Sequence, residues 1–118
     1  IMNNFKEYTV QLEEIHHVHK KDAPSGTAIS LAEGIIQNHA QYDAWKLEET
    51  QNHDLGIFAI RQDEVPGTHS VFYRSEVDEI EIRHAAFSRD GFALGAVMAA
   101  EWIQGKQGNF SMKDVLHL

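Results

Sequence analysis

The order of two hydrophobic periodicities along the chain constrains its fold more than any other feature. Apolar and polar residues alternate from Tyr8 to Leu12, which is the period of a strand with one buried face. The apolar residues between positions 28 and 37 instead recur at the spacing of one helix face. Three further strands and a second helix follow, with expected bounds Gly56–Arg61, Thr68–Arg74, Glu79–Phe87 and 91–104. The 118 residues suffice for one domain with a modest core.

This order predicts an α+β fold, in which two main helices pack on one face of a mixed β-sheet of about four strands. The last three strands are expected to form antiparallel hairpins, because their connections contain Pro66-Gly67 and Val77-Asp78. Asp90 is expected to cap the second helix. Residues 38–53 are expected to form a loop that can include a short helix or strand, and residues 110–118 a short terminal helix. The strands are apolar enough that the sheet needs further cover, so we expect oligomerisation.

Composition excludes several classes of function. The formal net charge of −8 argues against a general nucleic-acid or membrane-surface binder, so we expect neither partner. The chain has no cysteine, which excludes a disulfide framework, a cysteine zinc site and a cysteine nucleophile. It contains no apolar run of the roughly 18 residues that a membrane span needs. These features are compatible with a reducing cytoplasm.

The beginning of the chain indicates that a part of the protein is missing. Ile1 precedes Met2, which is not how translation starts, so we expect the chain to be a fragment of a longer protein. Neither a Gly-x-Gly-x-x-Gly turn after a strand nor a P-loop pattern is present. We therefore expect no nucleotide site within the chain itself.

The segment from His16 to Thr27 holds most of the candidate chemistry. A helix that starts at Ser25-Gly26-Thr27 would present unpaired backbone N–H groups and a partial positive charge. Glycine allows a ligand to approach the backbone closely, and two hydroxyls add donors, so this helix start suits a carboxylate or a phosphate. A simple helix cap explains the same three residues, and for an isolated motif it is the better explanation.

Lys20 and the neighbouring histidines extend this segment. Lys20 can offset the negative charge locally and donate a proton, although a lone lysine is usually a solvated surface charge. His16 and His17 point to opposite faces if a strand reaches them, so that one can face a ligand while the other anchors the loop. Histidine titrates near neutrality, which suits acid–base catalysis. Two hydrogen-bonded loop histidines nevertheless remain the simpler interpretation of the pair.

Other histidines and one arginine allow further interpretations. The three histidines between positions 16 and 19 permit a metal site, but the spacing of a zinc hydrolase is absent and we expect no metal. Arg89 stands just before the second helix, where it can clamp an anion or remain a surface charge. His69 and His84 alternate with apolar residues on strands. They are expected to lie in the core or at an interface rather than to act as catalysts.

The run from Glu14 to Ala28, EIHHVHKKDAPSGTA, closely resembles the signature of the dihydrodipicolinate reductases, E-x-H-H-x-x-K-x-D-A-P-S-G-T-A. The match is long and gapless. Further similarities lie at Arg61, Gly67 and His69, between Ile80 and Ala85, at Ser88-Arg89 and along the last helix from Phe92 to Trp102. The resemblance covers essentially the whole chain. Its main departure is Gln62-Asp63-Glu64, where the family usually has glycine in the turn.

The resemblance implies roles for the residues of the signature. His16 would be the acid–base residue and Lys20 the proton donor. The substrate-binding residues would be His17, Ser25, Gly26 and Thr27, with Arg89 assisting in anion binding or in the contact between domains. The substrate of the family is a small cyclic dicarboxylate. A nicotinamide cofactor reduces it, from 4-hydroxy-tetrahydrodipicolinate to tetrahydrodipicolinate, in lysine and diaminopimelate biosynthesis.

The resemblance also implies what the chain lacks. Residues 1–118 would form a single C-terminal substrate-binding and oligomerisation domain of a cytoplasmic homotetramer. The N-terminal Rossmann domain, which provides most of the site for NADPH or NADH, would be absent, and the fragment would be inactive alone. Two alternatives stay open: a non-catalytic oligomerisation or ligand-binding module, and a histidine-rich zinc hydrolase. Stoichiometric metal binding would support the hydrolase.

Overall fold

The computed structural model describes residues 2–48 and 50–118, which form two compact units. The first unit extends to Phe87 and contains every strand, and the second runs from Ser88 to Leu118 and contains two helices. A short 3-10 helix, η1 (Met2–Asn4), precedes the first strand. Among the residues described, none of the helices has both the length and the apolar character needed to cross a membrane.

The first unit is built on a mixed sheet. Its strands are β1 (Thr9–His16), β2 (Ala44–Leu47), β3 (Asp54–Arg61), β4 (Gly67–Arg74) and β5 (Glu79–Ala86). Their order across the sheet is β2-β3-β1-β4-β5, so β1 occupies the centre. β1 runs parallel to β3 and antiparallel to β4, while β2 pairs with β3 in parallel and β5 pairs with β4 in antiparallel. The end of β1 is therefore flanked by a strand on each side.

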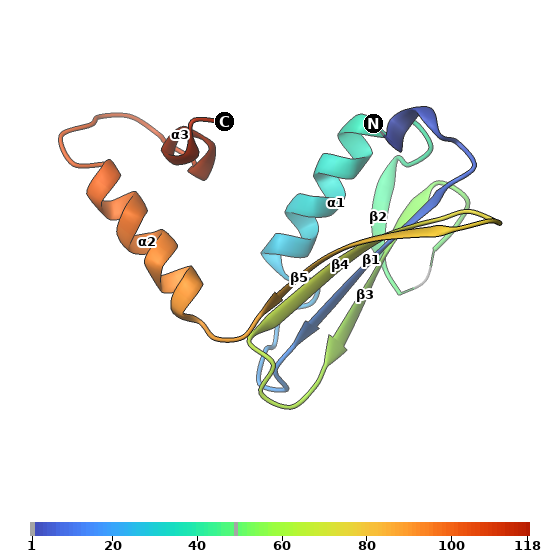
Figure 1. Cartoon of the computed structure of the whole chain (residues 1–118), viewed down its shortest axis with the longest axis horizontal. Helices are drawn as coiled ribbons and strands as arrows, with labels where there is room; N and C mark the ends of the chain where they lie inside the picture. Colours follow the sequence, from blue (N-terminus) through green and yellow to red (C-terminus); the bar gives the residue numbers. More distant parts are fainter. Residues whose placement is uncertain (1, 49) are drawn as a thin grey trace. The chain divides into compact units, whose positions relative to one another are not determined.

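The helix α1 (Gly26–Asn38) covers one face of this sheet (Figure 1). Its buried residues Ala28 and Ala32 have small side chains, which allow the helix to lie close to the strands. The core beneath it consists of Val10, Leu12, Tyr42, Leu55, Ile57 and Val71. Each large aliphatic side chain buried there contributes roughly 1.5–3 kcal/mol to folding. The face of β1 that α1 covers continues the apolar core into two buried polar residues, Glu14 and His16.

The sheet differs from the expected one in two respects. It has a fifth strand, β2, inside the segment expected to form mainly a loop, because a short polar strand with Trp45 as its anchor shows little periodicity. The hairpin expected between β3 and β4 is wrong, because β1 is inserted between them. The hairpin of β4 and β5 is confirmed, and its register pairs Arg74 with Glu79 across the turn. The mixed α+β architecture itself is confirmed.

The second unit contains α2 (Asp90–Trp102) and α3 (Met112–Leu116). Arg89, not Asp90, is the N-cap of α2, so the predicted cap is wrong. Asp90 instead occupies the first turn, where its charge still complements the helix dipole. Trp102 packs edge-to-face on Phe110 with 5.2 Å between ring centroids, which anchors the segment between the two helices. The terminal helix is confirmed, whereas the packing of α2 on the sheet stays a prediction.

Candidate functional site

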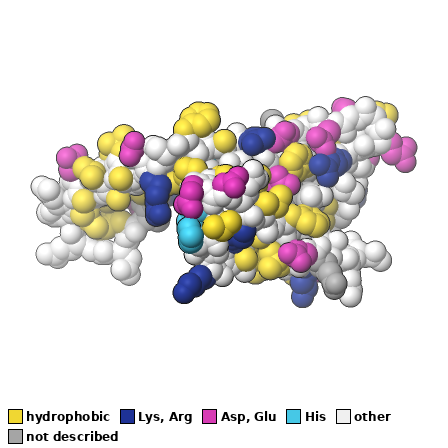
Figure 2. All heavy atoms as spheres, turned by 90° about the horizontal axis from the view of Figure 1, so that it is seen from below, with side chains coloured by type: hydrophobic (Ala, Val, Ile, Leu, Met, Phe, Trp, Pro, Cys, Tyr) yellow, Lys and Arg dark blue, Asp and Glu magenta, His cyan; other side chains and the backbone are white. Residues whose placement is uncertain are grey.

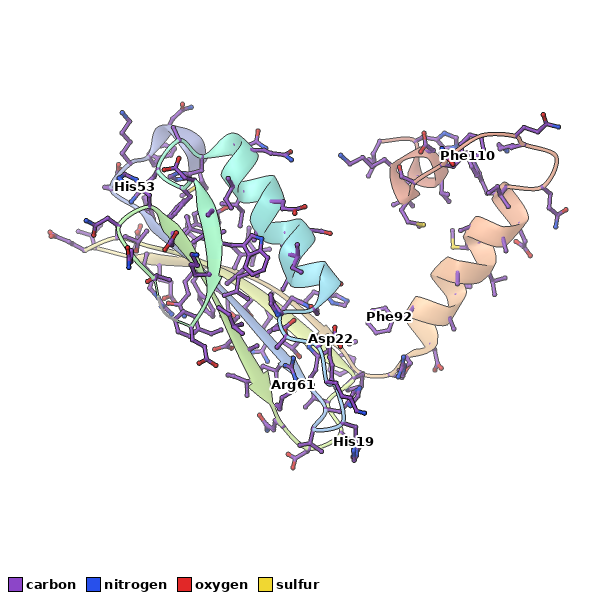
Figure 3. The ribbon with its side chains drawn as sticks, turned by 180° about the vertical axis from the view of Figure 1, so that it is seen from behind. His19, Asp22, His53, Arg61, Phe92 and Phe110 are labelled. Atoms are coloured by element: carbon purple, nitrogen blue, oxygen red, sulfur yellow. The ribbon has the colours of Figure 1, made fainter. Side chains whose placement is uncertain are left out.

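Most candidate residues lie at the carboxyl end of β1 and in the loop that leads from it to α1. β1 ends at His16, and its register partner at the end of β3 is Arg61. Figure 3 shows His19 and Asp22 of this loop gathered with Arg61 at the same end of the sheet. On the face seen in Figure 2, a histidine lies beside acidic side chains, with basic side chains nearby. Parallel pairing of β1 with β3 brings the loop and Arg61 together, because the carboxyl ends of both strands lie at the same end of the sheet.

Glu14 forms the buried centre of the site. Its side chain has no exposed surface, and its two carboxylate oxygens accept hydrogen bonds from different segments. Oε2 accepts from the backbone N–H of Ser25 at 3.0 Å, and Oε1 accepts from Nη2 of Arg61 at 3.2 Å. Burial by itself would raise the pKa of Glu14, but the hydrogen bonds from Ser25 and Arg61 outweigh it and the pKa lies below its ordinary value. An ionised carboxylate therefore lies directly under the start of α1.

Arg61 binds the backbone of the loop as well as Glu14. Its Nε donates to the carbonyl of Lys20 at 3.3 Å, and its Nη2 donates to the carbonyl of Asp22 at 2.6 Å. A planar guanidinium with five N–H donors is suited to such a bridge. One side chain of β3 thus connects β1 to both Lys20 and Asp22, which fixes the path of the loop.

Two histidine rings pack beside the Glu14 carboxylate. His16 lies on the same face of β1 as Glu14, and His69 is the partner of Glu14 on β4. The rings meet edge-to-face with 5.1 Å between centroids. Burial lowers the pKa of His16 below its ordinary value, and burial together with the neighbouring His16 lowers the pKa of His69. Both imidazoles are therefore neutral at pH 7 and can accept a proton at one ring nitrogen.

The start of α1 offers backbone donors to a ligand. Ser25 is the N-cap, and its Oγ accepts from the backbone N–H of Ala28 at 3.2 Å, which confirms the predicted cap. Gly26 and Thr27 follow on the exposed side, and a Cβ added at Gly26 would meet no other atom within 4 Å. Their N–H groups belong to the first turn, which has no intrahelical acceptor. Open space, free donors and the positive end of the helix dipole make this an anion-binding position.

Lys20 and His17 lie in the loop beside the helix start. The ammonium of Lys20 donates to both carboxylate oxygens of Asp22, at 2.9 and 2.7 Å. The hydrogen bond from Lys20 holds the pKa of Asp22 below its ordinary value. His17 is half-buried, and within the described part of the chain its buried Nδ1 has no hydrogen-bond partner. Lys20 therefore has an exposed carboxylate as its partner, which a ligand carboxylate can replace.

The candidate residues fall into two groups. The first group lies in one continuous stretch, from the end of β1 to the start of α1, and consists of His16, His17, Lys20, Ser25, Gly26 and Thr27. Arg89 belongs to the second unit, where it is the exposed N-cap of α2, and its part in anion binding stays a prediction. His69 is buried as expected and joins the first group through Ser25. His84 is exposed on β5, so burial in the core is wrong and only the expectation of an interface remains.

Sequence reasoning gave no functional part to Glu14. The strand was expected to end at Leu12, because two consecutive glutamates suggest a solvated loop. The alternation nevertheless continues through Glu14 to His16, with every second residue buried. A carboxylate at a position where the period demands a core residue was the signal that would have located this group.

A metal ion has a candidate position among the described residues. Glu14, His16 and His69 each offer one ligand atom, and these atoms lie within 4.8 Å of one another. The oxygens of Glu14 already accept hydrogen bonds from Ser25 and Arg61, and the positive charges of Arg61 and Lys20 act on His16. These features oppose a bound cation, so the expectation of no metal stays a prediction with physical support.

Comparison with known proteins covers nearly the whole chain. Residues 1–116 match the family model described as "Dihydrodipicolinate reductase, C-terminus". The chain is 51% identical over 116 residues to the 4-hydroxy-tetrahydrodipicolinate reductase of Christiangramia forsetii, covering 98% of this chain and 48% of that protein. It is 43% identical over 118 residues to the enzyme of the same name from Aquifex aeolicus, covering 96% of this chain and 44% of that protein. The chain thus spans about half the length of these relatives.

A solved structure has a similar fold. The dipicolinate-bound dihydrodipicolinate reductase from Paenisporosarcina sp. TG-14 superposes with a TM-score of 0.62 at 22% identity, covering 80% of this chain and 39% of that protein. At this level of identity the likeness concerns the fold. The match to the family model and the identities to the two relatives are what assign the sequence: the chain belongs to the dihydrodipicolinate reductase family and corresponds to its C-terminal part.

Proposed function

We propose that the chain is the substrate-binding half of an NAD(P)H-dependent oxidoreductase that reduces 4-hydroxy-tetrahydrodipicolinate to tetrahydrodipicolinate in lysine and diaminopimelate biosynthesis. Membership of the family supports this proposal, since its relatives are named 4-hydroxy-tetrahydrodipicolinate reductase. The dipicolinate-bound protein with a similar fold points to a small cyclic dicarboxylate as the class of ligand.

One observation carries the proposal: an exposed helix start with free N–H donors lies beside Lys20 in a chain of net charge −8. An anion drawn to an acidic chain needs a local positive site. The N–H groups of Gly26 and Thr27 would hold one carboxylate of the ligand, with the Thr27 hydroxyl and His17 as further donors. Lys20 would exchange Asp22 for the ligand, which retains a charge-assisted hydrogen bond.

His16 and Lys20 would handle the proton that accompanies reduction. A ring nitrogen whose pKa is lowered by burial is neutral at pH 7 and can take up or release a proton. Lys20, held through its backbone by Arg61, would be the proton donor to the reduced ring. The hydride itself would come from NADPH or NADH, bound mainly by a preceding Rossmann domain outside this chain, and the 4-hydroxyl group of the substrate would leave as water.

The assembly is part of the same proposal. The chain would act as one C-terminal substrate-binding and oligomerisation domain of a cytoplasmic homotetramer and be inactive alone. The exposed apolar residues of β5, Ile80 and Ile82, support an interface across that edge of the sheet. Arg89 would assist anion binding or the contact with the cofactor domain.

Titration of the chain with pyridine-2,6-dicarboxylate, a planar mimic of the substrate, tests the ligand class. Binding followed by NMR is expected to shift the amide signals of Gly26 and Thr27 and the side-chain signal of Lys20. Lys20→Ala and Lys21→Ala remove the same charge from adjacent positions, but Lys20 pairs with Asp22 beside the helix start whereas Lys21 is exposed. We expect Lys20→Ala to raise the Kd by about tenfold or more, as for the loss of one charge-assisted hydrogen bond, and Lys21→Ala to change it little.

Two results would reject the proposal. Equal effects of the two lysine variants would mean that the dicarboxylate responds only to overall charge. Stoichiometric zinc binding without any dicarboxylate response would favour a metal site instead.

A further inference from the structure

The buried carboxylate of Glu14 faces two neutral histidines from the centre of the sheet. Its Oε2 lies 3.6 Å from Nδ1 of His16 and 3.7 Å from Nε2 of His69. These are the two ring nitrogens that face an ionised group, and both side chains are buried, with 11% exposed for His16 and 9% for His69. We infer that Glu14 is a positioning residue, which places the proton of His16 on Nδ1 and the proton of His69 on Nε2. The consequences for a ligand rest on the proposed function, whereas the placement of the protons does not.

For His16, the inference follows from what surrounds Nδ1. This nitrogen is buried, and within the described part of the chain it has no hydrogen-bond partner. A bare lone pair there would face the negative oxygen of Glu14, whereas an N–H would present its positive end to that oxygen. At 3.6 Å the contact is mainly electrostatic, and burial strengthens it because water does not screen it. Placing the proton on Nδ1 leaves Nε2 as the nitrogen that accepts or returns a proton.

For His69, the inference follows from the hydrogen bonds of Ser25. Nε2 lies 3.0 Å from Oγ of Ser25, and Oγ also accepts from the N–H of Ala28. A proton on Nε2 makes His69 a donor to Oγ and also places the N–H near the negative carboxylate of Glu14. Both lone pairs of Oγ are then occupied, so the hydroxyl hydrogen of Ser25 is left for the Glu14 carboxylate, with which the Ser25 side chain forms a hydrogen bond that lowers the pKa of Glu14. The opposite tautomer would take that hydrogen for the bond to His69 and remove it from Glu14.

Glu14 therefore determines two properties of the proposed ligand site from beneath it. It keeps one nitrogen of His16 available for proton exchange, and together with His69 it fixes the orientation of the buried Ser25 hydroxyl at the start of α1. Arg61 compensates the charge of Glu14 at the other oxygen, so the carboxylate stays ionised while it performs this task. The residue would contact neither substrate nor cofactor, because its side chain has no exposed surface.

The tautomers can be measured directly in the ligand-free chain. Long-range ¹H–¹⁵N correlation spectra at pH 8 distinguish a protonated from an unprotonated ring nitrogen, and single His16→Gln and His69→Gln variants assign the two rings. We expect Nδ1–H for His16 and Nε2–H for His69. Glu14→Gln should convert both rings to mixed tautomers and weaken pyridine-2,6-dicarboxylate binding by about tenfold. Glu64→Gln is the matched control, because it removes an equally charged partner from exposed His19.

Either ring in the opposite tautomer in the unmodified chain overturns the inference, and this result needs no variant that might disturb folding. Unchanged tautomers in a folded Glu14→Gln chain overturn it as well. A chain with the expected tautomers but no response to the dicarboxylate would retain the inference and reject the proposed function. Dicarboxylate binding with the opposite tautomers would retain the proposed function and reject the inference.

Discussion

Replacing Arg61 by methionine tests whether the buried charge of Glu14 depends on one guanidinium. Methionine keeps much of the length of the side chain but removes every N–H donor. In the native chain, Arg61 donates to Glu14, Lys20 and Asp22. The variant would leave a carboxylate of zero exposure with Ser25 as its remaining close donor. We therefore expect a large loss of free energy of unfolding.

The expected loss is about 2–4 kcal/mol. Removing one partner of a fully buried ion pair costs roughly 3–5 kcal/mol, because the remaining charge is left uncompensated. The side chain of Arg61 is 22% exposed, so solvent screens part of its interaction and the lower part of that range applies. A domain with a total stability of roughly 5–15 kcal/mol tolerates such a loss and still unfolds measurably.

Urea denaturation followed by tryptophan fluorescence measures the loss. Trp102 lies in the second unit, so a Trp102→Phe background leaves Trp45, which packs against the core of the first unit, as the reporter. Arg74→Met in the same background is the matched control. Arg74 is 45% exposed and pairs with Glu79 on the surface, so its replacement should cost at most ~1 kcal/mol.

The pH dependence separates a charge effect from lost packing. The pKa of Glu14 is lowered in the folded chain, so its contribution is present above its ordinary value of 4.5 and is lost as the pH falls below that value. The difference between the native chain and Arg61→Met should therefore be full at pH 7.5 and shrink as the pH falls from 4.5 toward 3. A difference that stays constant from pH 7.5 to pH 3, or one no larger at pH 7.5 than that of Arg74→Met, would refute the reasoning.

Three further predictions concern the helix start, the histidines and turnover. Gly26→Ala should fold normally, because the added methyl group meets no atom within 4 Å. It should nevertheless raise the Kd for pyridine-2,6-dicarboxylate in a calorimetric titration, because the methyl group narrows access to the backbone N–H groups of the helix start. Folding lowers the pKa values of His16 and His69, so below about pH 6.5 the unfolded chain binds more protons than the folded chain. The free energy of unfolding should therefore decrease from pH 7.5 to pH 5.5. Urea titrations of a double variant, His16→Gln with His69→Gln, should show a smaller decrease. A chimera in which this chain replaces the matching half of the Christiangramia forsetii reductase should oxidise NADPH or NADH in the presence of substrate. Lys20→Ala should remove most of the kcat of the chimera, and Lys21→Ala should not. Equal kcat values for the two variants would remove Lys20 from the mechanism.

The periodicities predicted the elements of the fold better than their pairing. Alternation along Glu79–Ala86 and helical spacing after Ser25 were sufficient, because each pattern is local. The insertion of β1 between β3 and β4 was missed, since hairpin rules weigh the short connection at Pro66-Gly67 and cannot see a strand that arrives from earlier in the chain. Local sequence specifies a strand, whereas its neighbours depend on contacts across the whole sheet.

For the candidate site too, the sequence predicted the part that is local and missed the part that depends on strand pairing. The segment from His16 to Thr27 was found from sequence, because its donors are contiguous. Glu14, Arg61 and His69 come from three strands, and their grouping depends on register pairs that no local pattern reveals. Glu14 was also hidden by its type, since a glutamate is expected in solvent unless a partner is known.

The strand register gives the site a particular place in the folding of the chain. Glu14 pairs with His69 across β1 and β4, and His16 pairs with Arg61 across β1 and β3. A slip of one residue in either pairing would turn these side chains to the opposite face and separate them. A newly synthesised chain cannot assemble this group until β4 has emerged, although the residues of the signature are made much earlier. Completion of the central three strands and formation of the site are thus a single event, and ligand binding would report directly that the middle of the sheet has aligned correctly.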